Sequence, residues 1–214
     1  MNYKTFIDQY PVLKAIIHWS IHPPKRPRPR FWIRCFINPF IHRMGKHSLI
    51  RRPSRMDLFP FHPFSIGEWS TIESYSCVNN AMGPVHIGRN SRVGLGNTII
   101  GPVRIGDSVN MAQHITISGL NHGYEDVHLP PCDQPCQCAE IYIGNHCWIG
   151  ANVVITAGVK LGTHVVVAAG SVVTKSVPAF CVVAGNPAKI IKRYNPQMGV
   201  WLKETKNPIY GKAV

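Results

Sequence analysis

Large aliphatic residues recur at every sixth position through much of the chain. The most regular run comprises Ile143, Ile149, Ile155, Leu161, Val167 and Val173. Each is followed by a small residue, often glycine. A period of six fits neither a helix of 3.6 residues per turn nor a simple strand, in which side chains alternate. It fits a short strand and a tight turn repeated around a prism, and therefore predicts a parallel β-helix.

The same period appears upstream and is interrupted twice. The earlier runs are Ile66, Ile72 and Val78, and then Ile87, Val93, Ile99, Ile105, Met111 and Ile117. Between the two upstream runs, three extra residues around Gly83 and Pro84 are expected to bulge outward. Between Ile117 and Ile143 a longer excursion, near 118–140, leaves the coil and returns out of phase. Because the coils of a solenoid are repetitive, we expect function to reside in this excursion.

The period divides the chain into three parts. Residues 1–65 form a basic and aromatic lead-in with short helices, one of them starting at Pro11. Residues 66–184 form the β-helix, and residues 185–214 form a tail with a short helix. A length of 214 residues fits one domain with short appendages. The predicted class is all-β.

The lead-in mixes cations with aromatic side chains, and two interpretations of it remain open. It could rest on an anionic membrane surface, or its apolar groups could cap the open end of the solenoid. No apolar run reaches the roughly 18 residues that span a bilayer, and no signal-peptide pattern is visible. We therefore expect a cytoplasmic protein, peripheral at the inner face of the membrane if the first interpretation holds. The residues concerned are Lys25, Arg26, Arg28, Arg30, Arg34 and Arg43 with Phe31, Trp32, Ile33, Phe36, Ile37 and Phe40.

The charge balance is strongly basic. Lys and Arg total 23 against 10 acidic residues, giving a formal charge of +13 and a pI near 9.7. This imbalance predicts an anionic partner, which could be an acidic membrane or a phosphorylated cofactor. The chain has no zinc-finger, RNP-type or basic-zipper pattern, so we do not expect it to bind nucleic acid.

Seven cysteines raise the question of disulfides or metal. Their odd number, without a secretion signal, favours free thiols. Cys132, Cys136 and Cys138 cluster inside the excursion but lack a C-x-x-C pair, so they are either loop thiols or a zinc site. We expect thiols, and no metal.

One histidine differs from the rest in its surroundings. His122 follows the last regular strand and lies between Gly119 and Gly123, which allow sharp turns. A histidine in such a loop can act as a general base near neutral pH. Glu125 and Asp126 could orient its imidazole or could be solvated loop carboxylates. From spacing alone, an ordinary surface histidine is the favoured interpretation.

Several segments together resemble the hexapeptide-repeat acyltransferases with a left-handed β-helix, in particular sugar O-acetyltransferases of the maltose, galactoside and colanic acid type. The matching segments lie in order at 105–107, 121–124, 143–150, 169–175 and 184–189, and the resemblance covers about residues 45–194. The cysteine-rich part of the excursion departs from the common pattern. The lead-in is similar to that of colanic acid type enzymes, which favours a polysaccharide or lipid-linked acceptor.

The resemblance implies a homotrimer that transfers an acetyl group from acetyl-CoA to a sugar hydroxyl, in bacterial surface polysaccharide biosynthesis. It implies His122 as the catalytic base and Asn121, Tyr124 and Asn79 as substrate-binding residues. It implies that acetyl-CoA contacts Trp148, Ala151, Ala169, Thr174, Lys175, Lys189 and Lys192. Lysines suit the nucleotide phosphates because the phosphates are anionic.

Two other functions remain compatible with the sequence. A metalloenzyme like the γ-carbonic anhydrases shares the left-handed β-helix but needs three histidines that converge across a subunit boundary. A non-catalytic β-helix could bind membrane or glycan through its basic lead-in. Metal analysis and CoA binding distinguish these from an acetyltransferase.

Overall fold

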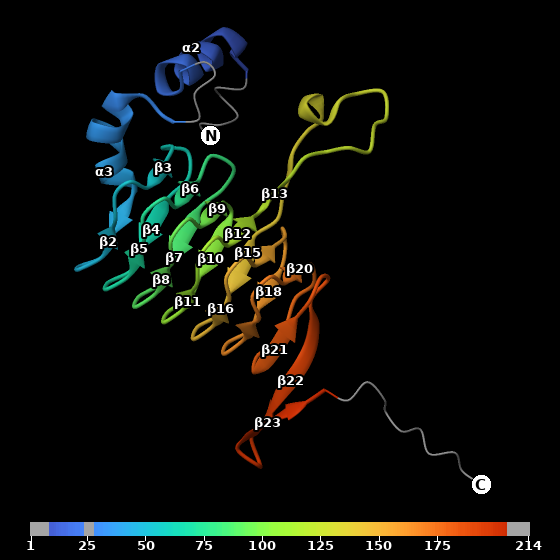
Figure 1. The fold of residues 1–214 in the computed structure, drawn as a ribbon. Coiled ribbons are helices and arrows are strands. Elements are labelled where there is room, and N and C mark those ends of the chain that lie inside the picture. Colours follow the sequence, from blue (N-terminus) through green and yellow to red (C-terminus); the bar gives the residue numbers. More distant parts are fainter. Residues whose placement is uncertain (1–8, 24–27, 205–214) are drawn as a thin grey trace.

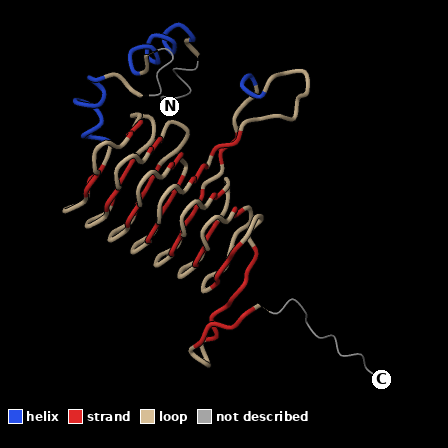
Figure 2. The backbone as a smooth tube through the Cα atoms, in the orientation of Figure 1, coloured by secondary structure: helices blue, strands red, loops and turns tan. Residues whose placement is uncertain are grey.

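The computed structural model describes residues 9–23 and 28–204. Figure 1 shows a stack of coils, with short helices at the N-terminal end and a hairpin that projects from the same edge further along. Each coil contributes one strand to each of three parallel sheets, and Figure 2 shows these strands separated by tight turns. The predicted parallel β-helix is therefore confirmed.

The three faces of the prism are called sheets A, B and C. Sheet A contains β1 (Arg43–Met44), β4 (Phe64–Ile66), β7 (Val85–Ile87), β10 (Val103–Ile105), β15 (Ile141–Ile143) and β18 (Lys160–Leu161). Sheet B contains β2 (Leu49–Ile50), β5 (Thr71–Ile72), β8 (Arg92–Val93), β11 (Asn110–Met111), β16 (Trp148–Ile149), β19 (Val166–Val167), β21 (Cys181–Ala184), β22 (Lys189–Asn195) and β23 (Val200–Lys203). Sheet C contains β3 (Arg55–Asp57), β6 (Cys77–Asn79), β9 (Thr98–Ile100), β12 (Thr116–Ser118), β17 (Val154–Ile155) and β20 (Val172–Val173).

The six-residue period places one aliphatic column along the inside of each sheet. In sheet A, for example, Ile87 pairs with Ile105, and Ile105 pairs with Ile143. All fifteen predicted positions are buried, with at most 3% of their surface exposed. Because these side chains belong to one continuous core that runs through all the coils, neighbouring coils stabilise one another.

The solenoid begins earlier than residue 66, so the expected boundary of the lead-in is wrong. β1, β2 and β3 form a complete first coil, in which Met44, Ile50 and Met56 pair with the first three predicted core positions. These three residues are themselves six apart, but two are methionines and Met44 is 54% exposed. The end coil has no neighbour on one side, so its inward positions do not need β-branched residues.

The lead-in proper comprises α2 (Pro11–Ile21), the π-helix η1 (Ile33–Ile37) and α3 (Asn38–Ile41). Ile21 and Ile33 pack with Phe59 in a small second core, at the turn that leads from sheet C back to sheet A. One side of these helices is thus buried on the solenoid, at a corner of its first coils. In the part of the chain that the structure describes, no helix is long and apolar enough to cross a membrane.

The C-terminal tail forms strands where a helix was expected. β21, β22 and β23 make an antiparallel extension of sheet B. The aromatic rings of Phe180, Tyr194 and Trp201 pack against one another along this extension in tilted pairs, with successive centroids 6.2 and 5.5 Å apart. This packing favours an extended chain over a helix. Residues 205–214 lie outside the described residues, as do Lys25 and Arg26 of the lead-in.

Replacing Ile155 by Asp is expected to unfold the solenoid. The side chain is 1% exposed, and an unpaired charge on the prism axis costs several kcal/mol. Thermal melting followed by circular dichroism measures the effect. Asn152→Asp, which adds the same charge at an exposed turn of the same coil, should leave the melting temperature nearly unchanged. Equal melting temperatures for the two variants would contradict the assigned core.

Candidate functional site

The excursion leaves the solenoid as an antiparallel hairpin at the corner between sheets C and A. Its strands are β13 (Leu120–Asn121) and β14 (Gln137–Cys138), and a 3-10 turn, η2 (Pro131–Asp133), lies near its tip. A Cβ atom at Gly119 would lie 2.6 Å from the Pro102 carbonyl oxygen, and one at Gly123 would lie 2.8 Å from that of Pro135. Both glycines are therefore required where the chain passes close to neighbouring backbone. They frame His122, which is exposed directly after β13.

Gln134 holds the far part of the hairpin together, although sequence reasoning missed it. It is 8% exposed, and its Nε2 donates to the carbonyl oxygens of Asp126 and Leu129, each at 2.8 Å. Its Oε1 accepts a hydrogen bond from the Asp126 amide at 3.1 Å. One buried amide side chain thus satisfies three backbone groups, so the excursion has a defined shape. The only sequence signal was a glutamine between prolines.

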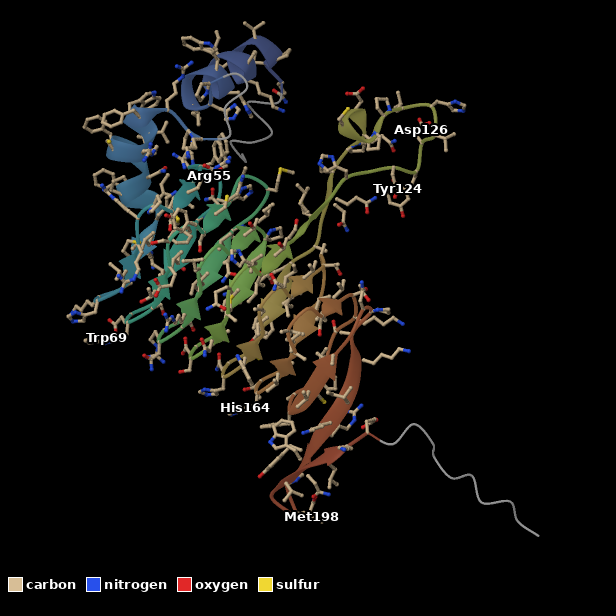
Figure 3. All side chains as sticks on the ribbon, viewed as in Figure 1. Arg55, Trp69, Tyr124, Asp126, His164 and Met198 are labelled. Atoms are coloured by element: carbon tan, nitrogen blue, oxygen red, sulfur yellow. The ribbon has the colours of Figure 1, made fainter. Side chains whose placement is uncertain are left out.

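The two carboxylates near His122 bond to the loop backbone instead. Glu125 Oε2 accepts from the Tyr124 amide at 2.9 Å, and Asp126 Oδ1 accepts from the His128 amide at 2.9 Å. The hydrogen bond from the Tyr124 amide is the main reason that the pKa of Glu125 is lowered. Among the described contacts neither carboxylate meets the imidazole, so of the two alternatives the structure favours loop carboxylates that do not orient it. Figure 3 labels Tyr124 and Asp126 on the projecting hairpin.

The partner of the imidazole is a thiol. Cys136 Sγ lies 3.6 Å from His122 Nδ1, across the hairpin. Cys132, Cys136 and Cys138 are free and exposed. Within residues 9–23 and 28–204, no group of three or more His, Cys, Asp or Glu side chains is arranged to hold a metal ion. In the tautomer whose Nδ1–H points at this sulfur, Nε2 carries the free lone pair and can take a proton from a bound molecule.

A second group of predicted residues lies along sheet B and its corner with sheet C. Trp148 projects outward from β16 and is 55% exposed. Ala151 and Ala169 belong to consecutive turns at this corner, and the Gly170 amide donates to the Ala151 carbonyl at 2.8 Å. A Cβ atom at Gly150 would lie 2.5 Å from the Ala169 nitrogen, so only glycine fits between these turns.

The predicted phosphate-binding residues divide between two corners. Lys189 starts β22 next to Ala188, whose amide donates to the Val172 carbonyl at 2.8 Å, so it adjoins the corner that holds Ala169. Lys192 lies further along β22, opposite Val182. Thr174 and Lys175 follow β20 and lie exposed at the corner between sheets C and A.

Asn79 lies in line with the root of the hairpin. It ends β6, and its register partner in β9 is Ile100, which in turn pairs with Ser118 at the end of β12. Asn79 Oδ1 accepts from the Ala81 amide at 2.8 Å. The edge of sheet C thus connects the predicted acceptor residue Asn79 to Asn121, His122 and Tyr124.

One chain does not bring the two groups together. The hairpin projects from the corner between sheets C and A, whereas Trp148 lies on sheet B, the face opposite that corner. In a triangular prism these positions point in different directions. A site that contains both His122 and Trp148 therefore requires two copies of the chain.

The repeat region matches a known family. Residues 140–175 match the family Bacterial transferase hexapeptide (six repeats). This stretch carries the six-residue repeat that the family model describes. The resemblance inferred from the sequence is thereby confirmed for this part of the solenoid.

Individual relatives agree with the family match. Over 113 residues the chain is 39% identical to galactoside O-acetyltransferase of Escherichia coli K12, covering 52% of this chain and 55% of the relative. Over 108 residues it is 37% identical to WbbJ of the same strain, named as a candidate lipopolysaccharide biosynthesis O-acetyl transferase, covering 47% of this chain and 55% of the relative. The chain thus spans about half the length of these curated relatives.

A solved structure shows the same fold. The N-acyltransferase AntD from Bacillus cereus, in complex with dTDP and 3-hydroxybutyryl-CoA, superimposes with a TM-score of 0.57. The alignment covers 73% of this chain and 85% of AntD at 19% identity. At that identity the likeness concerns the fold.

Alkylation should separate the exposed thiols from the buried ones. Burial raises the pKa of Cys147 to about 11 and also raises that of Cys181. At pH 8 only about one Cys147 in a thousand is then thiolate, and the group is also shielded. Mass spectrometry after brief iodoacetamide treatment should find label at Cys132 and Cys136 but at Cys147 and Cys181 only in denaturant. Native labelling of Cys147 as fast as Cys132 would contradict the placement.

Proposed function

We propose that this protein is an acetyl-CoA-dependent O-acetyltransferase that acetylates a sugar hydroxyl in bacterial surface polysaccharide biosynthesis. The observation that carries this proposal is the exposed His122, held by a shaped hairpin on a solenoid of transferase hexapeptide repeats. The names of the galactoside enzyme and of WbbJ support an O-acetyl transfer. The complex of AntD supports an acyl-CoA as the donor.

The reaction needs a base because a sugar hydroxyl is a weak nucleophile at neutral pH. His122 Nε2 accepts the hydroxyl proton while the oxygen attacks the thioester carbonyl carbon. The tetrahedral oxyanion then collapses, the carbon–sulfur bond breaks, and the imidazolium returns the proton to the CoA thiolate. No covalent acyl-enzyme is needed. This role requires the tautomer in which Nδ1 carries the ring proton and directs it at the Sγ of Cys136, 3.6 Å away.

The complete site forms between two copies in a homotrimer. His122 comes from one chain, and Trp148 comes from sheet B of its neighbour. The large exposed fraction of Trp148 in the single chain supports this arrangement, since an aromatic side chain gains most when it is covered. Three symmetric interfaces would create three such sites.

Acetyl-CoA lies along the corner between sheets B and C. The small residues Ala151 and Ala169 let the pantetheine arm approach the turns closely, and Trp148 packs beside it. Lys189 and Lys192 meet the phosphates from β22. Thr174 and Lys175 at the far end of β20 provide further polar and basic contacts. Cations suit this role because phosphate oxygens accept charge-assisted hydrogen bonds.

The acceptor lies along the edge of sheet C, where Asn79, Asn121 and Tyr124 contact the sugar. A polysaccharide precursor or a lipid-linked glycan fits this open edge better than a free monosaccharide, because the edge is long and not enclosed.

The lead-in would hold the enzyme at an anionic membrane, on the cytoplasmic side where acetyl-CoA is available. One side of its helices packs on the solenoid, and the other presents apolar side chains to solvent. Phe31, Phe36 and Phe40 are 74%, 66% and 88% exposed, and Trp19 is 61% exposed. Exposed aromatics beside several arginines suit an interfacial surface with anionic lipid.

Replacing His122 by Ala should lower acetyl transfer by roughly 10² to 10⁴ without weakening CoA binding, because a general base contributes about that much. Turnover of acetyl-CoA with a panel of saccharides and glycan precursors measures the first quantity, and calorimetry with CoA measures the second. Cys136→Ala removes the thiol of the same hairpin and should cost much less. Near-normal turnover of the His122 variant would remove this residue from its role.

Replacing both Phe36 and Phe40 by Ser should weaken co-sedimentation with anionic vesicles by about a hundredfold or more, since each buried Phe contributes about 1.5–3 kcal/mol. The melting temperature should not change, because both side chains are exposed. Met198→Ser removes an apolar residue that is 64% exposed on the C-terminal hairpin and serves as control. Binding that is unchanged in the double variant, or equal for neutral vesicles, would contradict membrane attachment.

A further inference from the structure

We propose that a pocket lined by four arginines, between the lead-in and the first coil, binds the phosphate or diphosphate group of the acceptor. The assignment to the acceptor rests on the proposed function, whereas anion binding rests on the pocket itself. The arginines are Arg28, Arg30, Arg34 and Arg55, and the cavity has a volume of about 640 Å³. This volume is within the range of small-molecule sites.

A buried carboxylate holds two of the four guanidinium groups in place. The Asp57 side chain is completely buried, and its Oδ1 lies 3.1 Å from Arg28 Nε. Its Oδ2 accepts from Arg55 Nε at 2.7 Å and lies 2.6 Å from a terminal nitrogen of Arg55. The hydrogen bond to Asp57 is the main reason that the pKa of Arg55 is raised. Because the two side chains are about half exposed, they keep donors that Asp57 does not use.

Arg30 is also fixed in position. Its Nε donates to the Trp19 carbonyl oxygen at 2.9 Å, and its guanidinium lies 4.6 Å from the centre of the Trp19 ring. Ordered guanidinium groups lose little entropy on binding, and their planar fork matches phosphate oxygens.

The charges in the pocket are not balanced. Among the described residues, the pocket lining holds four guanidinium groups, and the one carboxylate paired with any of them, Asp57, binds only those of Arg28 and Arg55. A cluster that served only to attach the lead-in would need no surplus cations, because neighbouring like charges oppose folding. The surplus matches the two or more negative charges of a diphosphate.

The pocket and the hairpin share one edge of the solenoid. Asp57 pairs with Asn79, Asn79 with Ile100, and Ile100 with Ser118, where the excursion begins. Three strand spacings of about 4.8 Å each, or about 14 Å in all, therefore separate Asp57 from Ser118. Figure 3 shows Arg55 and the hairpin on the same edge, with Trp69 and His164 on the other. An acceptor with its phosphate at the arginines can extend its sugars past Asn79 towards His122.

Calorimetric titration of the full chain with inorganic pyrophosphate tests the pocket. Saturating CoA is present throughout, so that the cofactor's phosphate site is already filled. Arg34→Gln should weaken binding by about tenfold, the effect of losing one charge-assisted hydrogen bond. Arg43→Gln removes the same charge from an exposed position on β1 outside the pocket and should have little effect. Unchanged melting temperatures show that both variants fold.

Two arms of the same experiment identify the source of the phosphate. A nucleotide diphosphate sugar and a short prenyl diphosphate are each titrated into the complex of the protein with pyrophosphate. The compound that displaces pyrophosphate with the higher affinity identifies the acceptor class. In turnover assays, Arg34→Gln should raise KM for a phosphate-linked acceptor and leave KM for a free sugar unchanged. Equal pyrophosphate affinity in wild type and Arg34→Gln, or equal losses in both variants, would overturn the proposal. Absence of any acetyl transfer would instead overturn the proposed function and leave the titration valid.

Discussion

Burial of the large aliphatic side chains that recur every sixth residue is the constraint on which the rest of the structure depends. Each strand is only two or three residues long in most coils, so no coil could be stable alone. Stacking places Ile99 on Ile117 and Ile117 on Ile155, and similar columns run along the other two faces. The columns fix the register, and extra residues can leave the solenoid only at its corners. The excursion with His122 uses one such corner.

The core could be predicted from the sequence because a period of six has few structural solutions. The first coil was missed because Met44 and Met56 replace the usual branched aliphatics at the end of the stack. The C-terminal strands were not predicted because their stability comes from pairing with β21 and from packed aromatic rings. The local pattern of apolar and polar residues does not reveal such contacts. Position along the chain likewise could not show that Glu125 and Asp126 bond to their own backbone, or that Cys136 faces His122 from the opposite strand of the hairpin.

The lead-in has two kinds of surface, one buried against the solenoid and one exposed to solvent. Ile21 and Ile33 bury against Phe59, which anchors the helices to the solenoid. The remaining aromatic side chains face solvent, and the arginines surround a cavity next to the edge of sheet C. Part of the positive charge of the chain is therefore concentrated around this cavity. An anionic acceptor would approach the hairpin from there.

The central claim is that the active site is shared between copies, with His122 from one chain and Trp148 from the next. Co-expression of His122→Ala and Trp148→Ala, each impaired alone, measures this most directly. In a randomly mixed trimer, about one quarter of the interfaces pair an intact His122 with an intact Trp148. Acetyl transfer by the mixture should therefore rise to about one quarter of the wild-type rate. Activity equal to the mean of the two separate variants would contradict a shared site.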